Sequence, residues 1–108
     1  MTGSDSDENE LIKSYNSVLR KTGKGGELLI DPRVIPVYEE VMDAVANCDS
    51  FDAGSEYQED GGVIVVRGCR YQWVIDARDK KDRFGSSPDA ANPDVTIRVL
   101  TVYPLDES

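Results

Sequence analysis

The hydrophobic pattern of this sequence changes its period near the middle of the chain. Over residues 9–47, apolar residues recur every three or four positions, which is the spacing of amphipathic helices. Over residues 63–103 they alternate with polar residues or form short β-branched runs, which is typical of strands. The polar stretch 49–62 between these halves contains three glycines. The pattern predicts an α+β domain with two N-terminal helices packed on one face of a small antiparallel sheet of three to four strands.

The first predicted helix begins after Asp7, which has the spacing of a capping box with Glu10. Its apolar face consists of Leu11, Ile12, Tyr15, Val18 and Leu19. Arg20 and Lys21 lie off this face in the last turn, where positive charge suits the helix dipole. Gly23 follows at the position where a glycine often ends a helix.

The second predicted helix has a proline near its start. Asp31 and Pro32 resemble an N-cap followed by proline at the first helical position. Pro36 would remove a backbone hydrogen bond from a regular helix interior. We therefore expect residues 32–35 to form an irregular or 3₁₀ lead-in and the regular helix to run from Pro36 to near Asn47.

A β-hairpin is predicted from strands 63–67 and 70–76. Gly68 and Cys69 between them predict a two-residue type II′ turn, because the leading glycine can adopt a positive φ. On the second strand, Tyr71, Trp73 and Ile75 share one face and are interpreted as core residues. Trp73 and Phe84 are also both assigned to the core.

A further strand is predicted over residues 95–103, and Pro104 ends it. Residues 26–30 would supply a fourth strand. At this length the chain is expected to form one domain over residues 9–105, preceded by a flexible acidic tail over residues 1–8.

Missing residue types exclude several kinds of chemistry. The chain has no His, which excludes catalysis by Ser-His-Asp or Cys-His groups. The stretch Gly23 to Gly26 lacks the length and the terminal Lys-Ser/Thr of a phosphate-binding loop, so we interpret it as a turn. No cofactor and no metal site are predicted.

The cysteines and the hydropathy indicate a cytoplasmic protein. Cys48 and Cys69 are too few for a disulfide framework and are both interpreted as buried small hydrophobic residues. The longest apolar run, residues 63–66, is far shorter than the roughly twenty residues of a membrane span. The N-terminus has neither the basic nor the apolar region of a signal peptide.

Charge divides the chain into two unlike halves. The net charge is −9, and residues 1–62 hold 14 acidic and 5 basic side chains. Residues 63–108 hold 7 of each. A surface of one sign steers association with a partner of the opposite sign and repels nucleic acid and anionic lipid.

The leading hypothesis is a small acidic binding protein of the immunity or inhibitor type, whose acidic helical face docks on a basic protein such as a nuclease toxin. The partner-binding residues would be acidic, with one aromatic anchor: Glu39, Glu40, Asp43, Asp49, Asp52, Glu56, Tyr57, Glu59 and Asp60. Two other interpretations of the acidity remain open, a solvated surface that keeps the protein soluble and adaptation to a high-salt cytoplasm. An exposed strand edge would also permit a homodimer.

The final strand carries a family resemblance. The segment from Val95 to Pro104, which ends in Thr-Val-Tyr-Pro, resembles the last core strand of the barnase, EndoU, colicin E5 and RelE group of small ribonuclease toxins. This resemblance implies an alternative function, a His-free ribonuclease that acts through the basic segment 67–83. Its implied catalytic residues are Arg78, Lys80, Lys81, Arg83 and Tyr103. The basic groups would stabilise the phosphorane, and the tyrosine would transfer protons.

Overall fold

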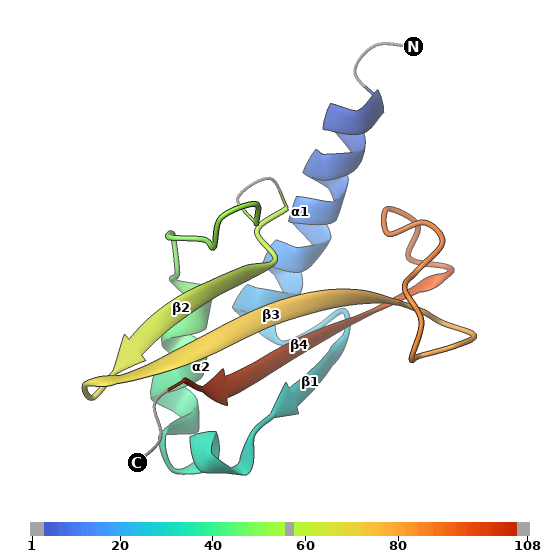
Figure 1. Cartoon of the computed structure of the whole chain (residues 1–108). Helices are drawn as coiled ribbons and strands as arrows, with labels where there is room; N and C mark the ends of the chain where they lie inside the picture. Colours follow the sequence, from blue (N-terminus) through green and yellow to red (C-terminus); the bar gives the residue numbers. More distant parts are fainter. Residues whose placement is uncertain (1–3, 56–57, 106–108) are drawn as a thin grey trace.

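The computed structural model describes residues 4–55 and 58–105. In chain order the elements are α1 (Ser4–Thr22), β1 (Glu27–Ile30), the 3₁₀ helix η1 (Pro32–Val37), α2 (Tyr38–Ala46), β2 (Gly61–Val66), β3 (Cys69–Asp79) and β4 (Thr96–Pro104). Figure 1 shows both α-helices on the same face of a four-stranded sheet. The predicted α+β architecture is confirmed, and so is the fourth strand near residues 26–30.

The sheet is mixed, whereas the sequence pattern predicted a wholly antiparallel one. Its strand order is β1-β4-β3-β2. The β2–β3 and β3–β4 pairs are antiparallel, but β1 pairs with β4 in parallel. Between β1 and β4 the chain passes through α2 and then through the β2–β3 hairpin. Strand β4 therefore runs beside β1 in the same direction. Alternation within a strand shows which face is buried but not which way the neighbouring strand runs.

Helix α1 is longer than predicted, and its buried face is rotated. It already includes residues 4–8, so the predicted cap at Asp7 is wrong and this part of the predicted tail is helical, while residues 1–3 lie outside the described residues. No Gly or Pro between residues 4 and 22 interrupts the helix. Its buried residues are Ile12, Asn16, Leu19 and Arg20, whereas Leu11 and Val18 are exposed.

The predicted ends of both helices are largely confirmed. Gly23 has φ 74°, and its N–H donates to the Leu19 carbonyl at 2.8 Å, so it terminates α1 as expected. Asp31 caps η1 by accepting from the Arg33 N–H. The 3₁₀ segment extends two residues further than predicted, through Pro36 to Val37, because proline cannot donate the hydrogen bond of a regular helix.

The hairpin turn lies one residue earlier than predicted. Val66 pairs with Cys69, so Arg67 and Gly68 form the turn. Both have positive φ, 53° and 78°, which is the backbone of a type I′ turn and not of the predicted type II′ turn. In this register Ile64 lies opposite Tyr71, and both side chains are on the buried face of the sheet.

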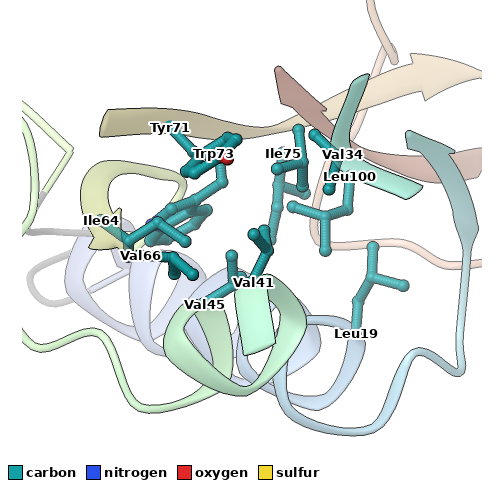
Figure 2. Close-up of a cluster of buried hydrophobic side chains, with 11 residues drawn as sticks. Leu19, Val34, Val41, Val45, Ile64, Val66, Tyr71, Trp73, Ile75 and Leu100 are labelled. Carbon is teal, nitrogen blue, oxygen red and sulfur yellow. The ribbon is translucent and has the colours of Figure 1, made fainter. Parts of the chain in front are cut away.

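The core lies between the two helices and one face of the sheet. Figure 2 shows Leu19 of α1 and Val41 and Val45 of α2 approaching residues of the strands. Among the strand residues, the predicted core face of Tyr71, Trp73 and Ile75 is confirmed.

Two predicted burials are wrong. Phe84 is fully exposed in the loop between β3 and β4. Cys69 is exposed because it directly follows the hairpin turn, whereas Cys48 is half-buried and packs against the core.

Candidate functional site

A hollow of the described surface lies where α1, α2 and the segment after α2 meet. It has a volume of about 690 Å³ and is lined by Arg20, Lys21, Asp43, Ala46, Asn47, Cys48, Asp49, Phe51 and Glu59. We call it the α2 cleft. In Figure 1 the green segment after α2 passes beside α1 at this place. Hydrogen bonds join the two, because Asn16 donates to the Gln58 carbonyl and Gln58 donates to Asn9.

Arg20 is a buried wall residue of the α2 cleft and not the exposed residue that the helical pattern predicted. It is 4% exposed. Its Nη1 donates to the carbonyls of Val45 at 2.9 Å, Ala46 at 3.2 Å and Cys48 at 2.8 Å. The last carbonyls of a helix have no partner within that helix. Arg20 therefore completes the C-terminus of α2 instead of stabilising its own helix end.

Aromatic rings and one carboxylate enclose the rest of the Arg20 guanidinium. Its central carbon lies 5.4 Å from the Phe51 ring centroid and 5.3 Å from the Trp73 ring centroid. These rings meet edge to face, with centroids 6.0 Å apart. A carboxylate oxygen of Glu59 lies 3.7 Å from Nη2. Arg20 is thus a shielded, immobile cation whose charge is already compensated.

Three of the predicted acidic residues meet at the α2 cleft. Asp43 comes from α2, Asp49 from the segment after it, and Glu59 from just before β2. Asp43 and Asp49 are exposed, and within the described residues neither forms an ion pair. Glu39 is also exposed and lies one helical turn from Asp43 on the same face of α2. The fold therefore gathers carboxylates that are far apart in the sequence.

The other predicted acidic residues are occupied within the fold or lie elsewhere. Glu40 forms an ion pair with Arg67. Asp52 accepts a hydrogen bond from the Gln72 amide at 2.8 Å. Asp60 is half-buried, and its carbonyl accepts from the Ile75 N–H. Glu56 and the proposed anchor Tyr57 lie outside the described residues.

The structure does not bring the alternative catalytic residues together. Tyr103 pairs with Gln72, whereas Arg78 pairs with Ile97 six positions away along the same ladder. At about 3.3 Å per residue this separates Tyr103 from the basic loop by roughly 20 Å. Arg78 and Arg83 are also paired with carboxylates, those of Asp76 and Glu27 respectively.

Sequence reasoning missed Arg20 and Phe51 as parts of this site. The signal for Arg20 was its position eight residues after Ile12, which is the i+8 position of the buried stripe, but its charge argued for exposure. Phe51 stands alone in a polar segment without any periodicity, so no pattern marked it.

The described residues contain neither a metal-binding cluster nor a membrane-spanning helix. Over residues 4–55 and 58–105, no three His, Cys, Asp or Glu side chains are grouped so that they could hold a metal ion. Among the described helices, none has the length and apolar character needed to cross a membrane.

Comparison with known proteins places the chain in a family. No curated protein and no solved structure matches it. A family model described as "Protein of unknown function (DUF3768)" matches residues 28–107. The match begins within β1 and includes α2 and the rest of the sheet, while α1 with Arg20 precedes it. Because it covers more than half of the chain, this protein belongs to the DUF3768 family.

Proposed function

We propose that this chain is a non-catalytic binding protein that takes a basic protein partner at the α2 cleft. The observation that carries the proposal is the meeting of Asp43, Asp49 and Glu59 around one hollow. The partner class follows from the net charge of −9, and the immunity or inhibitor type, acting in the cytoplasm, remains part of this proposal.

The α2 cleft suits a lysine or arginine side chain of such a partner. Asp43 and Asp49 are exposed and form no ion pair within the described chain, although Lys21 also lines the cleft, so docking would not first have to break an ion pair. Arg20 opposes an incoming cation only weakly, because three carbonyls and Glu59 already surround it. Glu39, one turn away, extends the acidic surface along α2. Charges at such a rim raise association rates and make binding depend on salt.

The test is a pair of charge-matched variants. The tagged chain is used at low and high salt to capture proteins from the cells that encode it, and captured proteins are purified. Their affinities are then measured by calorimetry. We expect Asp43→Lys combined with Asp49→Lys to weaken binding by about tenfold or more, since each reversal replaces attraction by repulsion. We also expect the wild-type affinity to fall as salt rises.

The control reverses two exposed carboxylates away from the α2 cleft, Glu8→Lys and Asp94→Lys. It changes the net charge equally and should preserve binding. If the two double variants bind equally well, or if the affinity of the captured protein is independent of salt, the proposal is wrong.

A further inference from the structure

A second hollow, separate from the α2 cleft, lies between α1 and the start of β4. Its volume is about 290 Å³. Tyr15 and Val18 of α1, Gly25, Lys80, Pro93 and the first three residues of β4 line it. We call it the Arg98 pocket. In a chain of net charge −9, its only charged lining residues are the cations Lys80 and Arg98. The nearest carboxylates along the chain, Asp79 and Asp94, are not among the lining residues.

Arg98 is held rigidly in this pocket. It is only 4% exposed although its side chain carries a charge. Its Nε donates to the Asn16 side-chain oxygen at 3.0 Å, and its Nη2 donates to the Ala90 carbonyl. The guanidinium carbon lies 4.8 Å from the centroid of the Tyr15 ring. These contacts come from α1 and from the loop before β4, so they fix the guanidinium between two parts of the fold.

Arg98 has no counter-ion within the described chain. Its hydrogen-bond partners are a neutral amide and a carbonyl, and none of the ion pairs of the described residues includes it. Burial therefore lowers the pKa of Arg98 below its usual value. Buried charges are normally paired, because removing an ion from water is costly. Arg20, by contrast, has both Glu59 and the carbonyls at the end of α2.

One part of the Arg98 guanidinium remains available. Nη1 makes no hydrogen bond within the described residues, and it is not among the polar atoms that protein fully encloses without a partner. The enclosed atoms of that kind in the described chain are Nε of Arg20 and Nε1 of Trp73. Arg98 also lines the pocket, so Nη1 is the guanidinium donor left for a molecule bound there. Lys80 adds a second cation that forms no ion pair within the same described residues.

The glycine-rich turn over residues 23–26 packs closely against the backbone of Arg98. Gly25 has φ 93° and lines the pocket, and its backbone N–H has no acceptor in the described part of the chain. A Cβ on Gly26 would lie 2.4 Å from the carbonyl oxygen of Arg98. Only glycine therefore allows the turn to approach β4 so closely. The turn over residues 23–26 thus contributes to the pocket wall, although its sequence lacks the pattern of a phosphate-binding loop.

We propose that the Arg98 pocket binds the phosphate group of a small molecule. A planar guanidinium with a free donor, together with an ammonium group, is a favourable arrangement for a phosphate dianion. The volume is close to the lower end of the range of about 300–1,000 Å³ for ligand pockets, which limits the ligand to a small one. Tyr15, Val18 and Ile97 provide apolar surface for a short organic group on the phosphate.

Titration of the full chain with three probes tests this proposal. Phenyl phosphate, inorganic phosphate and the neutral benzyl alcohol are added separately, and backbone NMR shifts are followed. We expect phenyl phosphate to shift the signals of Gly25, Lys80 and Arg98, and benzyl alcohol to leave them unchanged. Tighter binding of phenyl phosphate than of inorganic phosphate would support a phosphate ester, whereas equal binding would support free phosphate. Absence of shifts with both phosphates at millimolar concentration would overturn the proposal.

Two variants separate the pocket from general attraction between opposite charges. Lys80→Ala should weaken phenyl phosphate binding about tenfold, because a charge-assisted contact is lost. Lys81→Ala removes the same charge from the neighbouring exposed residue, which does not line the pocket, and should have little effect. Equal weakening by both variants would overturn the proposal. Neither variant alters a buried residue, so loss of folding does not obscure the result.

Discussion

Arg67, in the turn of the hairpin, forms a two-point ion pair with Glu40 of α2. Nε of Arg67 lies 3.0 Å from one carboxylate oxygen of Glu40, and Nη2 contacts the other oxygen. Hydrogen bonding to Arg67 lowers the pKa of the Glu40 carboxyl below 4.5. The pair connects the tip of the β2–β3 hairpin to the helix layer, and it occupies one of the carboxylates that the sequence assigned to a partner.

This ion pair should contribute to stability in a salt-dependent manner. Glu40→Gln removes the pair and leaves the turn unchanged, so we expect a lower melting temperature at low salt and a smaller difference at high salt. Arg67→Asn also removes the pair, but Asn adopts the positive φ of this turn more readily than Arg. We therefore expect Arg67→Asn to lower the melting temperature less than Glu40→Gln. Thermal unfolding at two salt concentrations measures both, and identical losses at both concentrations would contradict this expectation.

The cap at Asp31 should be sensitive to acid. Hydrogen bonds from the Arg33 side chain and backbone lower the pKa of Asp31 from 3.8 to about 2. A carboxyl with a lowered folded-state pKa stabilises the fold fully above its unfolded value, and this contribution disappears as pH falls from 3.8 toward 2. Carboxyl NMR titration measures the pKa. Arg33→Gln should raise it only part of the way to 3.8, because the backbone hydrogen bond remains. An unchanged pKa in this variant would show that the side chain is not the cause.

Arg20 should be necessary for the stability of the domain. Arg20→Met leaves Glu59 and the last carbonyls of α2 without their partner in a buried place, and we expect a loss of about 3 kcal/mol in the free energy of unfolding. Lys21→Met, at the next and exposed position, should change it by less than about 0.5 kcal/mol. Urea denaturation compares the two, and similar values would mean that Arg20 does not cap α2 in solution.

Two apolar residues of the β half should differ strongly in how much their truncation destabilises the fold. Leu100 is fully buried on β4, so Leu100→Ala should cost about 3 kcal/mol of unfolding free energy. Phe84 is 101% exposed, and Phe84→Ala should cost less than about 0.5 kcal/mol. Urea denaturation again measures both. A large loss for Phe84→Ala would restore the prediction from sequence that this ring belongs to the core.

Much of the fold could be predicted because its signals are local. The period of apolar residues identified both helices and the long strands, Gly23 and Asp31 marked helix ends, and Pro36 predicted the 3₁₀ segment. The hairpin turn was misplaced by one residue, because Arg67, a residue type that seldom adopts a positive φ, occupies the first turn position and Gly68 the second. The direction of β1 relative to β4 depends on the path of the chain through α2 and the hairpin. No local sequence pattern indicates this direction.

The candidate site was predictable only as a set of acidic residues. Composition and charge distribution indicated an acidic helical half, but not which carboxylates remain free. Asp43 and Asp49 remain free of ion pairs in the described chain. Glu40 does not remain free, because Arg67, 27 positions away in the sequence, binds it. The Arg98 pocket was not predicted from the sequence for the same reason, since Arg98 alternates with apolar residues like an exposed strand residue.

The sequence by itself thus determined the kinds of elements, their order and the balance of charge, since these depend on neighbours a few residues apart. The tertiary structure alone decided which charges are compensated and which remain available. Arg98 contacts Asn16 from 82 positions away, and Arg20 reaches the end of α2 from 25 positions away. Charges interact according to distance in space and burial, and the fold sets both.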